Sequence, residues 1–190
     1  MKLWDKIKGI ASSSDDVTTP QAASFPTRSD TIYAPVSGIL MRLEEINDEV
    51  LSAHLFGEGY GILPLNGILY APASGRIAAT TVTNHSIGML TDDGEELLMH
   101  IGLGTVAMNG KGFTCHVQQG DIVKAGTPLI TFDTEAIKAA GYEDVVTIII
   151  SNTGENVRVN HVGSSGTLLG GRPLVKVGDA LLVIRKPREE

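Results

Sequence analysis

Short apolar runs, each bounded by Gly, Pro, Asn or Asp, are the feature that most restricts how this chain can fold. Turn-forming residues at both ends of short apolar runs are typical of short β-strands joined by tight turns. One short helix is predicted over Thr134–Ala140, before Gly141, with Asp133 or Thr134 as its N-cap. The candidate strands are Ile39–Leu43, Gly61–Pro64, Gly67–Ala71, Arg76–Val82, the two arms of a hairpin around Asp92–Gly94, Leu129–Phe132, Val145–Ser151 and Leu181–Arg185.

Two stretches of the chain recur. The Tyr-Ala-Pro-Val-Ser-Gly of Tyr33–Gly38 returns as Tyr-Ala-Pro-Ala-Ser-Gly in Tyr70–Gly75, and Gly120–Leu129 is matched loosely by Gly171–Leu181. The proline in each Ser-Gly unit belongs at a strand edge or turn, because it cannot donate to a central ladder. We therefore predict an all-β fold, a β-sandwich or barrel-like structure with an internal pseudo-repeat and few short helices.

Length and charge narrow the class of protein. At 190 residues and 42% hydrophobic composition, the chain can bury the core of one domain. A net charge of −7 argues against nucleic-acid binding, which depends on a positive surface. Cys115 is the only cysteine, so a reducing compartment is expected, and no apolar run approaches the roughly 20 residues that span a bilayer. These observations favour a cytoplasmic protein.

The chain divides into three parts by composition. Residues 1–10 have apolar side chains at helical spacing, including Trp4, with lysines on the other faces. This amphipathic segment suits either a membrane surface or a frayed or packed terminus. Residues 11–30 are rich in Ser, Thr, Asp and Pro and are predicted to be a flexible linker. The folded domain is expected to span residues 31–190.

Two histidines flank the predicted hairpin turn. If Asp92 and Asp93 form a two-residue loop, His85 lies directly opposite His100, and if Asp93 and Gly94 form it, the two are diagonal neighbours. Only a three-residue loop would send them to opposite faces of the sheet. Two of three registers therefore bring the imidazoles together.

The chemistry of such a pair is not decided by its spacing. A neutral imidazole nitrogen can carry a covalent phosphoryl group, and a second imidazole can donate an N–H to the phosphoryl oxygens. Thr83 lies two residues before His85 and could orient that ring through its hydroxyl. A structural role is the alternative, and a stable zinc site would need a third or fourth ligand. The other histidines, His54, His116 and His161, are expected to lie at the surface or to bond to the backbone.

A series of motifs resembles a known family, the glucose-type EIIA phosphocarriers of the bacterial sugar phosphotransferase system. The resemblance runs in order from about Tyr33 to Asn152, and a weaker repeat near 166–184 closes the domain. The matching stretches are Ala34–Gly38, Gly57–Ile62, Ala71–Gly75, Thr83–His85, Leu98–Gly102, Thr105–Val106, Gly110–Phe113, Gly120–Gly126 and Ile150–Asn152.

The resemblance implies a phosphotransferase component that works through a phosphohistidine. His100 would accept a phosphoryl group on Nε2 from phospho-HPr and pass it to a cysteine on the EIIB domain of a sugar permease. His85 would stabilise that group, and Thr83 would orient His85. The family transfers the group between side chains without Mg²⁺ or another cofactor, on an all-β sandwich built as a duplicated hybrid motif. Its free-standing members also imply a peripheral contact of residues 1–10 with the inner face of the membrane.

The chain departs from the family pattern at the rim of the implied site. Gly104 stands where family members usually carry Asp, which puts the docking of HPr in question. Leu51 replaces a frequent aromatic and keeps the rim apolar. Asp48 is retained and is expected to help meet a basic partner.

Three rival functions remain. A zinc peptidase of related architecture would need a His-x-His motif, which neither His100 nor His116 begins. A biotinyl or lipoyl carrier would need a modified lysine in a different context from that of Lys124. The third rival is a regulatory module that binds proteins according to its phosphorylation state, with weakened carrier activity. For that role the family implies a zinc ion at His85 and His100, shared with a partner's carboxylate.

Overall fold

The computed structural model describes residues 18–153 and 157–186, so the predicted segment 1–10 and the first part of the linker lie outside the described residues. The strands are β1 (Thr31–Tyr33), β2 (Gly38–Arg42), β3 (Glu58–Pro64), β4 (Ile68–Tyr70), β5 (Gly75–Thr80), β6 (Ser86–Thr91), β7 (Glu96–Leu103), β8 (Phe113–Cys115), β9 (Ile122–Val123), β10 (Pro128–Phe132), β11 (Glu143–Ile150), β12 (Arg158–His161), β13 (Leu168–Leu169), β14 (Arg172–Val175) and β15 (Ala180–Arg185). The helices are α1 (Glu49–Ser52) and α2 (Thr134–Ala139), with 3₁₀ turns η2 (Leu43–Glu45) and η3 (Thr105–Met108).

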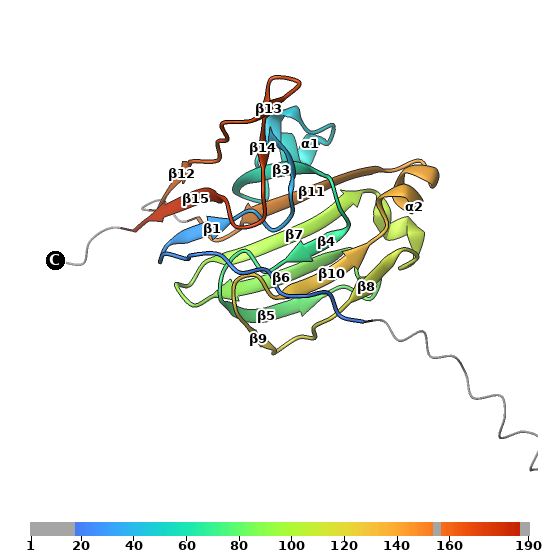
Figure 1. Cartoon of the computed structure of the whole chain (residues 1–190), viewed down its shortest axis with the longest axis horizontal. Coiled ribbons are helices and arrows are strands. Elements are labelled where there is room, and N and C mark those ends of the chain that lie inside the picture. Colours follow the sequence, from blue (N-terminus) through green and yellow to red (C-terminus); the bar gives the residue numbers. More distant parts are fainter. Residues whose placement is uncertain (1–17, 154–156, 187–190) are drawn as a thin grey trace, which may run out of the picture.

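The strands form three antiparallel sheets, which confirms the all-β prediction. The largest has nine strands in the order β13-β14-β2-β3-β11-β7-β6-β5-β9. Two three-stranded sheets have the orders β1-β15-β12 and β4-β10-β8. Figure 1 shows α1 beside the β13–β14 hairpin at the top of the molecule and α2 at the right-hand end. No helix in the described part of the chain is long and apolar enough to cross a membrane.

The large sheet separates two apolar clusters. The main core holds Val146, Ile148 and Ile150 of β11 together with buried residues of the two small sheets. On the other face, Val145 and Ile149 of the same strand pack with buried side chains from η2 and α1. Strand β11 is therefore buried on both faces, as its continuous apolar sequence predicts. We call the face that carries the second cluster the outer face.

Backbone hydrogen bonds confirm the internal pseudo-repeat. Tyr33 N–H donates to Pro72 O (3.0 Å), and Tyr70 N–H donates to Pro35 O (2.8 Å), so the two Tyr-Ala-Pro stretches bond to each other reciprocally. Both repeat serines also accept from a distant turn. Ser37 Oγ accepts from Val177 N–H, and Ser74 Oγ accepts from Ala125 N–H. The same local sequence thus makes the same bonds twice.

The helix prediction is confirmed with its cap. Helix α2 starts after Asp133, whose side chain accepts a hydrogen bond from Ala136 N–H at 2.9 Å. The sequence patterns missed the short helix α1 and several two- to four-residue strands. Helix α1 is capped by Asp48, which accepts from Val50 and Leu51 N–H at 3.0 and 2.9 Å.

The described part of the predicted linker contacts the domain. Ala23 N–H donates to Gly126 O at 2.9 Å, and the ring of Phe25 lies 5.3 Å from that of Tyr33. Asp30 N–H donates to the Asp93 carboxylate at 2.8 Å, at the tip of the β6–β7 hairpin. That tip is also bonded to Lys186, just after β15, which forms an ion pair with the buried Glu95. Segments from both ends of the domain therefore meet at one hairpin turn.

Candidate phosphoryl-transfer site

The β6–β7 hairpin has a different register from the two that were expected to join its histidines. Ser86, not His85, pairs with His100, because the loop Asp92–Gly94 has three residues between Thr91 and Glu95. Gly94 takes the positive φ of +95° that such a loop needs. The prediction that a three-residue loop separates the histidines is wrong, since the two rings nevertheless meet.

The reason lies just before β6. His85 precedes the first residue of that strand, and Asn84 before it has a left-handed backbone with φ of +55°. The alternation of side chains along the strand therefore does not extend to His85. The backbone stays paired, because His85 O accepts from Ile101 N–H at 2.8 Å. The imidazole can then turn towards the outer face, where His100 lies.

The two imidazoles form a close pair. Their ring centroids are 4.8 Å apart and the planes meet at 81°, so one ring presents its edge to the face of the other. The residue His85 is buried, with 7% of its surface exposed, and His100 is partly buried. Burial lowers the pKa of both, since it disfavours the charged form. Both rings are thereby favoured as neutral imidazoles near neutral pH.

Several groups around His100 change its pKa. After burial, the charge of a protonated His85 lowers the pKa of His100 further, while a hydrogen bond to the Gly102 backbone and the nearby Asp48 carboxylate raise it. A bond that stabilises the charged ring is one in which the ring N–H donates. Gly102 has φ of +75°, and a side chain there would collide with Thr105 and with the backbone of Glu143. In the neutral His100 ring, which burial favours, one nitrogen keeps its lone pair.

His85 is held by threonine hydroxyls. Thr83 Oγ1 lies 2.6 Å from His85 Nδ1, and Thr81 Oγ1 lies 3.4 Å from the same nitrogen. Thr81 was not predicted as a site residue. The only sequence feature that points to it is the Thr-x-Thr-Asn-His spacing. That spacing does not reveal the turn after residue 81, which brings Thr81 close to His85.

The rim of the site is formed by short loops. Asp48 caps α1 and lies near enough to His100 to favour its charged form. Gly104, the N-cap of η3, has φ of +74°, and a Cβ there would lie 3.2 Å from the Tyr142 ring. Val106 of η3 is exposed, and so is Val82 in the turn before His85. The combination is a polar pair on an apolar surface.

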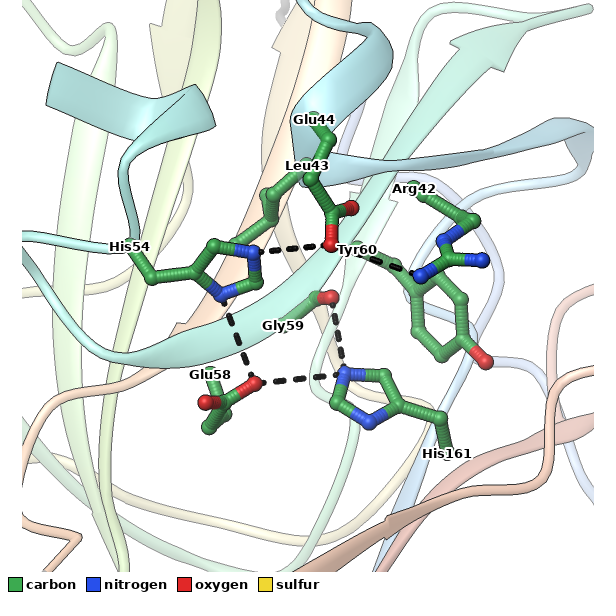
Figure 2. Close-up of a pocket in the computed structure, with 8 residues that line it drawn as sticks. All are labelled: Arg42, Leu43, Glu44, His54, Glu58, Gly59, Tyr60 and His161. Carbon is green, nitrogen blue, oxygen red and sulfur yellow. Dashed lines mark hydrogen bonds and ion pairs between the residues drawn. The ribbon is translucent and has the colours of Figure 1, made fainter. Parts of the chain in front are cut away.

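A second group of titratable side chains lies apart from the histidine pair. Figure 2 shows His54, Glu44, Glu58 and His161 pointing towards one another around a cavity of about 540 Å³. His54 Nε2 is 3.2 Å from Glu44 Oε1, and its Nδ1 is 3.4 Å from Glu58 Oε2. His161 Nε2 lies 3.7 Å from the same Glu58 oxygen and 3.3 Å from Gly59 O. This cluster of histidine and carboxylate side chains ties the residues after α1 to β3.

The donor sets do not form a metal centre. In residues 18–153 and 157–186, no three histidine, cysteine or acidic side chains are arranged to hold a metal ion. The pair His85 and His100 offers two imidazoles, fewer than a stable zinc site needs. What the pair does offer is a nitrogen nucleophile next to a second, oriented imidazole.

Comparison with protein families matches this chain to one described family. The model of the phosphoenolpyruvate-dependent sugar phosphotransferase system, EIIA 1, matches residues 30–156. This range includes both histidines and Thr83.

Individual relatives agree with that match. The chain is 35% identical over 175 residues to the glucose-specific EIIA component of Halalkalibacterium halodurans, covering 92% of this chain and 98% of the relative. It is 42% identical over 124 residues to the β-glucoside-specific EIIBCA component of Bacillus subtilis, covering 65% of this chain. The chain spans only about a fifth to a quarter of the length of such β-glucoside-specific relatives.

A solved structure has the same fold. Glucose permease IIA from Mycoplasma capricolum superposes with a TM-score of 0.70 at 31% sequence identity, covering 85% of this chain and 99% of that one. The similarity extends over nearly the whole of that protein.

Proposed function

This chain belongs to the phosphoenolpyruvate-dependent sugar phosphotransferase system EIIA 1 family, and from that premise we propose that it is a phosphocarrier. In this proposal His100 accepts a phosphoryl group from phospho-HPr and passes it to the cysteine of an EIIB domain. The observation that carries the proposal is the perpendicular His85–His100 pair, with 4.8 Å between ring centroids.

Acceptance of the group is a substitution at phosphorus. The lone pair of His100 Nε2 forms a new N–P bond as the N–P bond of the HPr phosphohistidine breaks, and the electron pair of the broken bond returns to the HPr imidazole. The choice of Nε2 over Nδ1 comes from the resemblance to the glucose-type EIIA phosphocarriers. The lowered pKa of His100 keeps that lone pair available near neutral pH.

His85 serves as the donor to the transferred group. If Thr83 donates its hydroxyl proton to His85 Nδ1 over 2.6 Å, the imidazole proton resides on Nε2. That N–H can then donate to a phosphoryl oxygen on the neighbouring His100. A fixed donor of this kind is typically worth about 10²–10³ in rate.

The onward step is a second substitution at phosphorus. A thiolate of the EIIB domain attacks the phosphorus, an S–P bond forms as the N–P bond to His100 breaks, and the electron pair of the broken bond returns to the His100 imidazole. The names of the β-glucoside-specific relatives, which are EIIBCA components, support an EIIB partner. No metal ion or other cofactor is needed for either step. In this proposal a zinc ion binds only when a partner adds ligands to His85 and His100.

The proposed carrier acts in the cytoplasm and meets the permease at the inner face of the membrane. Residues 1–10, which lie outside the described residues, are the proposed peripheral contact. No feature of the described site favours a regulatory binding module over a phosphocarrier. Phosphorylation-dependent binding of other proteins would use the same apolar rim.

Labelling with phosphorylated HPr tests the proposal. The full chain should become labelled, His100→Gln should not, and His85→Gln should accept the label but pass it on at least about 10²-fold more slowly. His116→Gln is a matched control, because His116 bonds to Thr131 instead of the pair. A phosphohistidine loses its label in acid and keeps it in alkali. If the His100 variant accepts the label, the assignment is wrong.

A further inference from the structure

Thr81 occupies a position that the proposed function does not use. It begins the turn that carries Thr83, Asn84 and His85, and it closes that turn onto Ser86. Thr81 N–H and the Thr81 hydroxyl both donate to Ser86 O at 3.2 Å, while Ser86 N–H donates to Thr81 Oγ1 at 3.2 Å. Asn84 N–H donates to Thr81 O at 3.0 Å. One residue therefore anchors both ends of the loop that holds His85.

The same hydroxyl oxygen also faces the His85 ring. Nδ1 has two oxygen neighbours, Thr83 Oγ1 at 2.6 Å and Thr81 Oγ1 at 3.4 Å. The two hydroxyls are not equivalent. The proton of Thr81 is engaged with Ser86 O, so this oxygen can only accept from Nδ1, whereas the proton of Thr83 is available to Nδ1.

Each protonation state of His85 uses a different threonine. In the neutral ring Thr83 donates to Nδ1, and the ring proton stays on Nε2. In the charged ring Nδ1 carries a proton and needs acceptors. Thr83 can accept once its own proton turns away, and Thr81 can accept without any change in its bonds to Ser86.

The charged ring has few other sources of stabilisation. In the described part of the chain burial is the only influence on the pKa of His85, with no contribution from a carboxylate, and the aromatic ring packed against it is that of His100. Burial works against the charge, and a charged His100 would work against it too. A weak acceptor at Nδ1 therefore matters more here than it would at an exposed histidine.

We propose that Thr81 is a positioning residue for His85 that accepts a hydrogen bond from Nδ1 when His85 is charged. The proposal rests on the proposed function, because His85 gains from a second proton when a dianionic phosphoryl group arrives on His100. In that state Nε2–H faces the phosphoryl group, and Nδ1–H is shared between the two threonine oxygens.

Three variants of the full, unphosphorylated chain separate the roles of the two threonines. Thr81→Val keeps the branched shape without the hydroxyl, Thr81→Ser restores the hydroxyl, and Thr83→Val removes the other partner. Imidazole nitrogen NMR reports the tautomer of His85 and its pKa. We expect Thr81→Val to keep the Nε2–H tautomer and lower the pKa of His85, Thr81→Ser to restore that pKa, and Thr83→Val to mix the tautomers.

Transfer rates give a second readout. Onward transfer to EIIB should be about threefold slower in Thr81→Val, because a long hydrogen bond to a charged group contributes modestly, while labelling by phospho-HPr stays unchanged. Amide exchange at Ser86 shows whether the turn has opened. An unchanged His85 titration in Thr81→Val overturns the proposal, even if Ser86 exchanges faster. So does a Thr81→Ser variant that titrates like Thr81→Val.

The NMR readout also stands apart from the proposed function. If the wild-type chain cannot be labelled at His100, the phosphocarrier assignment fails, while the tautomer and pKa measurements still decide the role of Thr81.

Discussion

The histidine pair should not carry two charges at once. The ring centroids are 4.8 Å apart, and two unit charges at that distance repel by about 3.5 kcal/mol at an effective dielectric constant of about 20. In bulk water the repulsion would be only about 0.9 kcal/mol. Because His85 is buried and His100 is partly exposed, the real value lies between these limits. We therefore expect the pair to titrate in two separate steps.

Removing one charge tests this coupling. In His85→Gln the pKa of His100 should rise, because the repulsion from a protonated His85 is gone while burial by the neighbouring loops persists. In His100→Gln the pKa of His85 should rise for the same reason. His116→Gln is the matched control. Burial lowers the pKa of His116 as well, but its Nε2 contacts Thr131 Oγ1 at 2.6 Å and not the pair.

Imidazole NMR of the full, unphosphorylated chain measures all three titrations. The coupling predicts that each variant of the pair shifts the remaining histidine upwards, and that the control leaves both unchanged. If His100 titrates identically in the wild type and in His85→Gln, the two charges do not interact. The electrostatic account of the site would then be wrong.

Three further predictions concern stability and location. The free energy of unfolding should fall as the pH drops below about 6.5, the ordinary histidine value, because burial lowers the pKa of His85, His100 and His116 and the unfolded chain therefore takes up protons more readily. In urea unfolding this dependence should disappear when all three become Gln. Lys186→Met should cost about 2 kcal/mol in the same assay, because it leaves the buried Glu95 without its cation although Lys186 itself is partly exposed, whereas Arg42→Met in an exposed pair should cost less than about 1 kcal/mol. Deleting residues 1–16 should slow sugar phosphorylation by membranes and leave labelling by soluble HPr unchanged. If the deletion variant matches the full chain in both assays, the membrane role is contradicted.

Predictions from the local sequence were correct where a single segment contained all the residues on which the prediction depended. The continuous apolar run in β11 predicted a strand buried on both faces, and Asp133 predicted the start of α2. The repeated Tyr-Ala-Pro stretches predicted the pseudo-repeat, because identical local sequences make identical bonds. The short strands at the edges were missed, since two to four residues carry too little periodicity to be recognised.

The sequence predicted the pairing of His85 with His100 only in two registers that the hairpin does not have, and it predicted separation in the register that the hairpin has. Apolar and turn residues around Asp92–Gly94 define a hairpin, yet three loops fit the same sequence. The folded structure has the three-residue loop. The left-handed backbone of Asn84 then lets the His85 side chain depart from the alternating side-chain pattern of the strand. The partners of the rings, Thr81 and the Gly102 backbone, depend on how the chain turns after the strands end. Composition and periodicity are read along the chain, whereas such contacts form between segments whose relative position only the folded core sets.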